Sequence, residues 1–184
     1  MAASDHELFV EFQDSQISWL STVGSGEQWG TKSIRESNPT ASQRTRSWIE
    51  RSEQNGPWSS DWCRAFVAEA SNGVPVAGLV LDSKAPAYVQ SVLPDQDESD
   101  PFAYLAYLIS NRHAGEERKG AAAALIAFAK DQVRSVGLNR ICLDCWRGND
   151  RKLVRYYESQ GFKPLKDFIA VEKDWPGCVL EMRL

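Results

Sequence analysis

The chain has 184 residues, of which 42% are hydrophobic and 25% are charged. This composition is that of an ordinary globular protein, and the length suits one domain with its own core. The net charge of −4 supplies no broad basic surface, which argues against nucleic-acid binding. No run approaches the roughly 18 apolar residues of a membrane helix, and the start "MAASDHELFVEF" lacks the order of a secretion signal. We therefore expect a cytoplasmic protein with neither membrane nor nucleic-acid partners.

The cysteines raise the question of redox or metal chemistry. Cys142 and Cys145 form a C-x-x-C pair, which can be redox active or bind zinc. The pair lies in "RICLDCW", a typical buried strand, where side chains three residues apart point to opposite faces. The sequence has no second Cys/His pair at ligand spacing. We therefore predict reduced, structural cysteines and no metal site.

The amino-terminal part is expected to begin with a strand and two helices. "LFVEF" (8–12) is typical of a short strand, and "SQISWLSTV" (15–23) of a helix that ends at Gly24 and Gly26. Thr40 or Ser42 can cap a second helix, which runs to about Gln54 and stops at the Asn-Gly-Pro of residues 55–57.

A β-hairpin and a long connection are expected next. "CRAFVAEA" and "VPVAGLVLD", joined by Asn72-Gly73, give the clearest hairpin signal in the chain. Residues 83–101 contain three prolines and "DQDESD", and predict a long acidic connection. Loops of this length in a compact domain are often functional.

The carboxyl-terminal part alternates strands and helices. The predicted strands are 102–110, "RICLDCW", "DFIAV" and "VLEMRL", with Trp175-Pro176-Gly177 as the turn between the last two. One predicted helix begins after residue 120, has Leu125, Ala129 and Val133 on one face, and ends at Gly137. A second predicted helix covers residues 149–160 and ends at Gly161. A strand–helix–strand unit implies local parallel pairing in a mostly antiparallel sheet with helices on its faces.

The stretch "HAGEERKGAAAALIAFAK" (113–130) predicts a loop that turns into a helix. Anions bind at helix N-termini, where unpaired N–H groups and the positive end of the dipole meet. A nucleotide-triphosphate loop needs a lysine and a hydroxyl residue after its last glycine. Ala121 and Ala122 follow Gly120 instead, so that class is excluded, and no G-x-G-x-x-G is present.

The same loop resembles the pyrophosphate loop of the GNAT superfamily of N-acetyltransferases, whose pattern is [Q/R]-x-x-G-x-[G/A]. The matching register runs from Glu117 to Ala122. The segments "LDCWRGN", "RYYESQGF" and "WPGCVLEMRL" also resemble the second half of such a domain, and "WLSTVGSGEQWG" resembles its amino-terminal helix and loop. The likeness covers most of residues 7–184 and is strongest over 104–163.

The resemblance implies an α/β fold with a splayed, mixed and mostly antiparallel sheet of about six to seven strands, as a single domain over 1–184. It implies an acetyl-CoA-dependent N-acetyltransferase acting by direct attack on a primary amine of a small or amino acid-like molecule, as a monomer or homodimer. The cofactor site would comprise Leu108, Ile109, Ser110, Arg118, Lys119, Gly120, Ala121, Ala122 and Asn149. Tyr157 would protonate the leaving thiolate.

The sequence differs from the family's loop pattern in two respects. Glu117 occupies the family's Gln or Arg position, and the loop is about three residues longer than usual. They motivate an alternative, a catalytically reduced CoA-binding or interaction module.

The base and the acceptor contacts stay open. Asp144, Asp82 and Glu27 are candidate bases, and Asp144 is preferred, although it could instead pair with Arg140 or Arg147. Gln28 and Trp29 are candidate acceptor contacts, and Trp29 could equally be a packing residue. The acidic "DQDESD" suggests a cationic acceptor, but is equally explained as a solvated loop.

Overall fold

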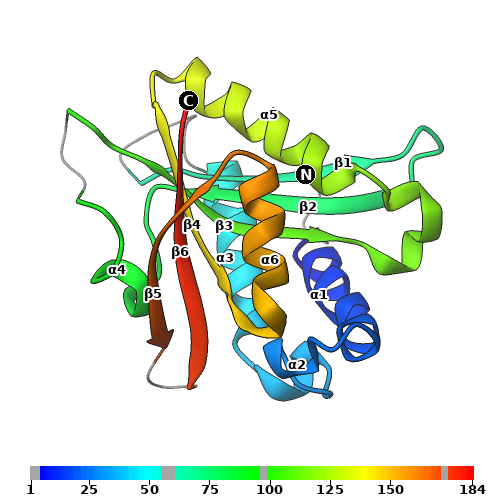
Figure 1. Ribbon diagram of the computed structural model, residues 1–184. Coiled ribbons are helices and arrows are strands. Elements are labelled where there is room, and N and C mark those ends of the chain that lie inside the picture. Colours follow the sequence, from blue (N-terminus) through cyan, green and yellow to red (C-terminus); the bar gives the residue numbers. More distant parts are fainter. Residues whose placement is uncertain (1–4, 55–60, 96–98, 171–173) are drawn as a thin grey trace. The chain divides into compact units, whose positions relative to one another are not determined.

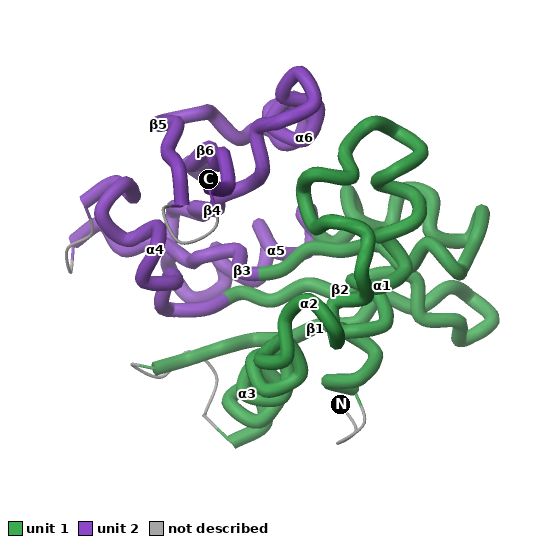
Figure 2. Tube along the Cα trace, turned by 90° about the horizontal axis from the view of Figure 1, so that it is seen from below, with its two compact units in different colours: residues 1–81, 107–125 green, residues 82–106, 126–184 purple. Residues whose placement is uncertain are grey.

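The computed structural model describes residues 5–54, 61–95, 99–170 and 174–184. The chain divides into two compact units, shown in green and purple in Figure 2. Unit 1 comprises residues 1–81 and 107–125, and unit 2 comprises residues 82–106 and 126–184. The strand β3 (Ala103–Ser110) and the helix α5 (Ala121–Ser135) each belong partly to one unit and partly to the other (Figure 1).

Unit 1 begins with one long helix, so the predicted strand at 8–12 is wrong. Phe9, Phe12, Gln16 and Leu20 are buried at spacings of three and four, which is the period of a helix face rather than of a strand. The helix ends just before Gly24, whose φ of 72° is left-handed, as predicted for a terminator. The helical elements of this part are α1 (Asp5–Thr22), η1 (Gly26–Gln28), α2 (Ile34–Ser37) and α3 (Ala41–Gln54).

The predicted hairpin is confirmed as β1 (Cys63–Glu69) and β2 (Pro75–Asp82). Gly78 in β2 lets two aromatic rings approach the strand, since a Cβ there would lie 3.2 Å from both Phe9 and Tyr107. The Tyr107 hydroxyl donates to the Phe9 carbonyl at 2.6 Å. Trp48 of α3 packs edge-on against the same tyrosine, with ring centroids 5.8 Å apart. These rings form the core of unit 1.

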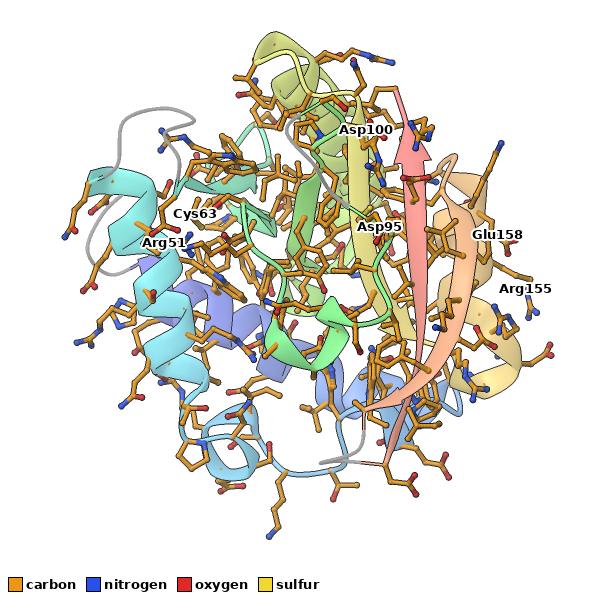
Figure 3. The ribbon with its side chains drawn as sticks, turned by 90° about the vertical axis from the view of Figure 1, so that its left-hand side faces the viewer. Arg51, Cys63, Asp95, Asp100, Arg155 and Glu158 are labelled. Atoms are coloured by element: carbon orange, nitrogen blue, oxygen red, sulfur yellow. The ribbon has the colours of Figure 1, made fainter. Side chains whose placement is uncertain are left out.

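Unit 2 contains α4 (Ala87–Gln90), β4 (Arg140–Trp146), α6 (Gly148–Ser159), β5 (Lys163–Ala170) and β6 (Trp175–Arg183). Its core on the α4 side is formed by Val89, Phe102, Tyr104, Cys142 and Val179. The helix α6 packs against β4, β5 and β6, while its Arg155 and Glu158 point outward (Figure 3).

The strand order is β1-β2-β3-β4-β6-β5, which confirms a six-stranded mixed sheet. β3 pairs with β4 in parallel at Ala103 and Tyr104, and β6 is antiparallel to both β4 and β5. The predicted turn at 175–177 is wrong, because these residues open β6 and pair with Phe168, Ile169 and Ala170. Pro176 is tolerated because it stands at the start of its strand.

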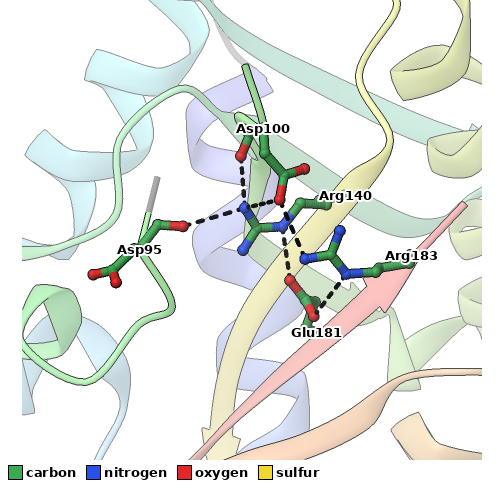
Figure 4. Close-up of polar contacts among 5 residues, drawn as sticks. All are labelled: Asp95, Asp100, Arg140, Glu181 and Arg183. Atoms are coloured by element: carbon green, nitrogen blue, oxygen red, sulfur yellow. Dashed lines mark hydrogen bonds and ion pairs between the residues drawn. The ribbon is translucent and has the colours of Figure 1, made fainter. Parts of the chain in front are cut away.

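The end of the connection 83–101 is attached to β4 by a buried arginine (Figure 4). Arg140, 2% exposed, donates to the Glu181 carboxylate at 2.7 Å and to the Asp100 carboxylate at 2.9 Å. It also donates to the backbone carbonyls of Asp95 and Asp100. Arg183 approaches the same Asp100 carboxylate at 3.2 Å. The predicted helix stop at 55–57 and residues 96–98 of the acidic run lie outside the described residues.

Candidate functional site

The predicted site residues fall into two sets. The loop residues Arg118 to Ala122, the strand residues Leu108 to Ser110, and Gln28 and Trp29 belong to unit 1. Asp144, Asn149 and Tyr157 belong to unit 2.

The predicted loop is a kinked helical turn that leads into α5. The segment η2 (Arg112–Arg118) bends at Gly115, and Gly120 takes a left-handed φ of 78° immediately before α5. The Gly120 carbonyl accepts from the Ala124 N–H at 2.9 Å, so this glycine caps the helix. The N–H groups of residues 121–123 precede that bond and have no carbonyl within the helix to bond, and the side chains of these residues are alanine methyl groups. This arrangement suits an anion such as a pyrophosphate.

Both glutamates of the loop have partners. The Glu117 carboxylate, exposed to solvent, accepts a hydrogen bond of 2.7 Å from the Asn72 side chain in the turn between β1 and β2. Glu116 forms an ion pair with Lys119. The two carboxylates that argued against an anion site are therefore both engaged. Glu117 is hydrogen-bonded to the hairpin, and the charge of Glu116 is neutralised by Lys119.

Two arginines of the loop carry positive charge close together. The Arg112 guanidinium lies over the Trp19 ring, 3.3 Å from its centroid, and its Nε donates to Gln16 at 2.9 Å. Burial, and then the charge of Arg118, lower the pKa of Arg112 to about 10. The Arg118 Nε is buried and has no hydrogen-bond partner among the residues that the structure describes. An orphaned cationic donor beside a second cation is the arrangement that an anion stabilises.

The strand residues expected to contact the cofactor end β3. Ile109 is buried, whereas Leu108 and Ser110 are half-buried. The Ser110 carbonyl accepts from the buried amide of Gln16 on α1. Asn111, which follows, donates from its side chain to the Pro75 carbonyl at 2.9 Å, so the start of the loop is attached to both α1 and β2.

Gln28 and Trp29, the proposed acceptor contacts, lie at the end of η1 and are half-buried. The Gln28 N–H donates to the Ser25 carbonyl at 3.0 Å. Nothing in their geometry distinguishes a packing role from an acceptor contact.

Asp144 does not pair with an arginine. Tyr88 donates to both carboxylate oxygens at 3.1 Å, and Tyr104 also donates to the carboxylate. Arg140 is engaged by Asp100 and Glu181 instead. Burial raises the pKa of Asp144, and the two tyrosine hydroxyls oppose the rise only in part.

Tyr157 is buried on the face of α6 that packs on the sheet, 7% exposed, with its ring edge-on to Phe162. Burial and then the neighbouring Cys145, Tyr156 and Asp144 raise the pKa of Tyr157 well above 10. Its hydroxyl therefore stays protonated at neutral pH. Its neighbour Tyr156 is half-buried.

Asn149 opens α6 in an unusual backbone conformation. Asn149, Asp150 and Arg151 have left-handed φ values of 47°, 53° and 57°. Each such residue costs about 1–2 kcal/mol, although Asn and Asp tolerate the region better than others. Gly148, just before them, must be glycine, because a Cβ would lie 2.1 Å from the Trp146 ring. Trp146 is thereby confirmed as a packing residue.

All four cysteines are buried, and none forms a disulfide within the part of the chain that the structure describes. The burial of Cys142 and Cys145 agrees with the prediction that they are structural. Burial raises the pKa of Cys142 to about 12 and the pKa of Cys178 to about 11, and raises the pKa of Cys145 further. Thiols of this kind are poor nucleophiles at neutral pH. Over the described ranges, no group of three or more His, Cys, Asp or Glu side chains is placed to hold a metal ion.

Tyr88 and Tyr104 were not predicted as site residues, and Asn72 was predicted only as a turn residue. Arg112 was considered only for an alternative register of the loop, which places Gly115 too far from the helix. The buried strand "FAYLAYLIS" contains two tyrosines, and a buried tyrosine hydroxyl needs a partner, which was a usable signal for Tyr104. The side chains of Tyr88, Arg112 and Asn72 contact residues that are distant in the sequence, and no local sequence pattern predicts those contacts.

A sequence model described as "Acetyltransferase (GNAT) family" matches residues 29–162. The chain therefore belongs to the GNAT acetyltransferase family, an acyltransferase family that uses acetyl-CoA. No curated protein sequence matches it.

Solved structures share the fold. A GNAT-family acetyltransferase from Listeria monocytogenes 4b F2365 aligns with a TM-score of 0.68 at 16% identity, covering 100% of this chain and 92% of that one. The PaiA N-acetyltransferase from Thermoplasma acidophilum, in complex with coenzyme A, aligns with a TM-score of 0.62 at 17% identity, covering 100% and 96%. An aminoglycoside 6′-acetyltransferase type Ii aligns with a TM-score of 0.57 at 12% identity, covering 100% and 94%.

Among the helices that the structure describes, none combines the length and the apolarity that crossing a membrane would need.

Proposed function

We propose that this protein is an N-acetyltransferase that transfers the acetyl group of acetyl-CoA to a primary amine of a small or amino acid-like molecule. Residues 1–184 are proposed to form one such domain, because β3 and α5 each continue through both units. A cytoplasmic location, in the absence of a membrane helix among the described residues, is part of the same proposal.

The observation that carries the proposal is the cationic loop before α5. Among the described residues, the buried Nε of Arg118 has no hydrogen-bond partner. Burial and then the charge of Arg118 lower the pKa of Arg112, and Gly120 leaves the N-terminus of α5 open. A CoA pyrophosphate would accept from Arg118 and from the first N–H groups of α5, and would offset the repulsion between the two arginines. Lys119 would add charge from the exposed side, despite its pairing with Glu116.

The alternative, a catalytically reduced CoA-binding or interaction module, was motivated by Glu117 and by the longer loop. Because that carboxylate is bonded to Asn72, it gives no reason to expect weakened CoA binding. The catalytic reading is therefore preferred.

Asp144 is the proposed base. An aliphatic amine is almost entirely protonated at neutral pH, so a proton must leave before attack. The ammonium would give one proton to the Asp144 carboxylate, whose raised pKa favours acceptance, and this proton then passes to solvent. Bound acetyl-CoA supplies a thioester carbonyl: the nitrogen forms a C–N bond as the C–S bond breaks, and the sulfur leaves with the electron pair. The second proton of the nitrogen goes to the thiolate.

Tyr157 is proposed to carry this second proton: its hydroxyl protonates the leaving thiolate and takes the proton of the nitrogen in return. A tyrosine with a pKa well above 10 remains protonated throughout the working pH range. Asn149 is proposed to contact the cofactor from the strained start of α6.

The test combines binding with turnover. We expect acetyl-CoA to bind by isothermal titration calorimetry and an amine panel to release free CoA thiol. Tyr157→Phe should lower kcat by about 10²-fold or more with little change in acetyl-CoA affinity, the size typical of lost acid catalysis. Tyr156→Phe, the half-buried neighbour, is the matched control and should leave kcat unchanged. Absence of acetyl-CoA binding would overturn the proposed function.

A further inference from the structure

The carboxylate of Asp144 is surrounded by phenol groups rather than by cations. Tyr88 and Tyr104 donate to it from α4 and β3, and the other described acid–base groups near it are Tyr157 and Cys145. None of the ion pairs among the described residues involves Asp144. Its negative charge is therefore solvated by hydroxyls and not neutralised.

Aromatic side chains extend from this carboxylate. Tyr88, 50% exposed, stacks on Phe168 of β5 with ring centroids 6.3 Å apart and 27° between the planes. The ring centroids of Phe168 and Trp175 lie 6.4 Å apart. Gly177 of β6 makes room for this arrangement, since a Cβ there would lie 2.4 Å from the Phe168 ring. Tyr88, Phe168 and Trp175 thus form a row of aromatic rings, and the Asp144 carboxylate lies at its Tyr88 end.

Two other acids of unit 2 are already paired. Asp100 pairs with Arg140 and Arg183, and Asp167 pairs with Arg151 at 2.7 Å. The described partners of Asp144 itself are hydroxyls, so its carboxylate offers a ligand one negative charge beside the rings of Tyr88 and Phe168. A second positive charge on a ligand would be desolvated there without a carboxylate partner.

We propose that Asp144, Tyr88 and Phe168 form the acceptor subsite, and that the acceptor is a monoamine carried on an apolar or aromatic body. The inference rests on the proposed function and names its substrate class. The ammonium group lies on the Asp144 carboxylate, where a charge-assisted hydrogen bond replaces one from Tyr88. The adjoining carbons lie against the rings of Tyr88 and Phe168, which also attract the cation. Polyamines and polyhydroxylated amines fit this subsite poorly.

The test compares benzylamine and cyclohexylamine with ethylamine and spermidine as acceptors, at saturating acetyl-CoA. We expect kcat/KM for the two ring-bearing monoamines to exceed that for the other two by about tenfold or more, the discrimination that an apolar pocket achieves. Tyr88→Ala and Phe168→Ala should remove most of this preference by raising KM for the ring-bearing amines. Ile169→Ala, the next residue on β5 and also exposed, is the matched control and should keep the preference.

Acetyl-CoA affinity, measured by calorimetry on each variant, separates this inference from the proposed function. Failure to bind acetyl-CoA overturns both. Binding together with acetylation in which spermidine or ethylamine is preferred, or with a preference that Tyr88→Ala and Phe168→Ala leave intact, overturns the acceptor subsite alone. Binding without acetylation of either ring-bearing amine overturns it as well. Tyr88→Phe keeps the ring and is the substitution least expected to disturb folding, and it should retain the preference for ring-bearing amines.

Discussion

The Glu117 carboxylate accepts a hydrogen bond of 2.7 Å from the Asn72 amide, which joins the loop before α5 to the turn between β1 and β2. The residue that departs most from the family's loop pattern is therefore turned toward a hairpin. Its charge stays in solvent, where it is well screened. The bond gives the loop a second attachment, beside the bonds of Asn111 to β2.

The first prediction concerns this bond. Glu117→Gln keeps an oxygen that accepts from Asn72 and should change acetyl-CoA affinity by less than about threefold, since a solvent-exposed charge has a small effect. Asn72→Ala frees the carboxylate and should weaken binding more strongly, with the loss reduced at high salt. Calorimetry at two salt concentrations measures both. A strong gain in affinity in Glu117→Gln would show that the carboxylate faces the cofactor.

The second prediction concerns Arg118. Because it lies beside Arg112 without a partner for its Nε, Arg118→Gln should slightly stabilise the ligand-free protein while lowering acetyl-CoA affinity by about 10- to 100-fold, the worth of a charge-assisted hydrogen bond. Thermal unfolding and calorimetry report the two effects. Arg134→Gln, in the last turn of α5, makes the same charge change and should alter neither by much. Parallel losses of stability and affinity would mean that Arg118 is a structural residue.

The third prediction uses the pKa of Asp144. Because the folded-state pKa is raised above the ordinary value of 3.8, the folded protein holds the proton more tightly than the unfolded chain, and the burial of the charge costs stability as pH rises through the folded pKa. Asp144→Asn removes that cost. The melting temperature of the variant relative to the wild type should therefore be higher at pH 7 than at pH 4. A difference that is constant with pH would contradict a raised pKa.

The fourth prediction concerns Arg140. Its removal deprives two backbone carbonyls of this donor and leaves Glu181, 13% exposed in its side chain, with the longer pairing of 3.5 Å to exposed Arg183, so Arg140→Met should lower the free energy of unfolding by about 3–5 kcal/mol. Arg183→Met removes an exposed partner of the same Asp100 and should cost much less stability, because exposed ion pairs contribute little. Chemical denaturation measures both. Equal effects would show that burial of Arg140 contributes nothing.

The fifth prediction concerns the thiols. With burial raising the pKa of Cys142 to about 12 and of Cys178 to about 11, the native protein should react with Ellman's reagent at pH 8 far more slowly than the protein in denaturant. Rapid modification of the native protein, accompanied by loss of activity, would point to a functional cysteine.

The carboxyl-terminal part of the fold could be predicted because its patterns are local. The face Leu125, Ala129 and Val133 and the terminator Gly137 define α5, and "RICLDCW" defines β4. The errors arose where a local signal was outweighed by packing. "LFVEF" is rich in strand-forming residues, but its burial continues at helical spacing as far as Leu20, and Pro176-Gly177 suggests a turn but pairs within β6.

The loop was located by its glycine and basic residues, whereas its supports were not. Trp19, Asn72 and Gln16 approach it from elements far away in the sequence. The environment of Asp144 was missed for the same reason, since Tyr88 and Tyr104 lie 56 and 40 residues away along the chain. Such contacts depend on tertiary structure, which residue spacing does not encode.

Acetyl transfer to an amine can be measured by mass spectrometry of a reaction that contains the protein, acetyl-CoA and benzylamine. We expect N-acetylbenzylamine and free CoA in equal amounts, formed at a rate that Asp144→Asn and Tyr157→Phe both lower and Tyr156→Phe leaves unchanged. Tight binding of acetyl-CoA with no acetylated product from any amine offered would contradict the proposed acetyl transfer.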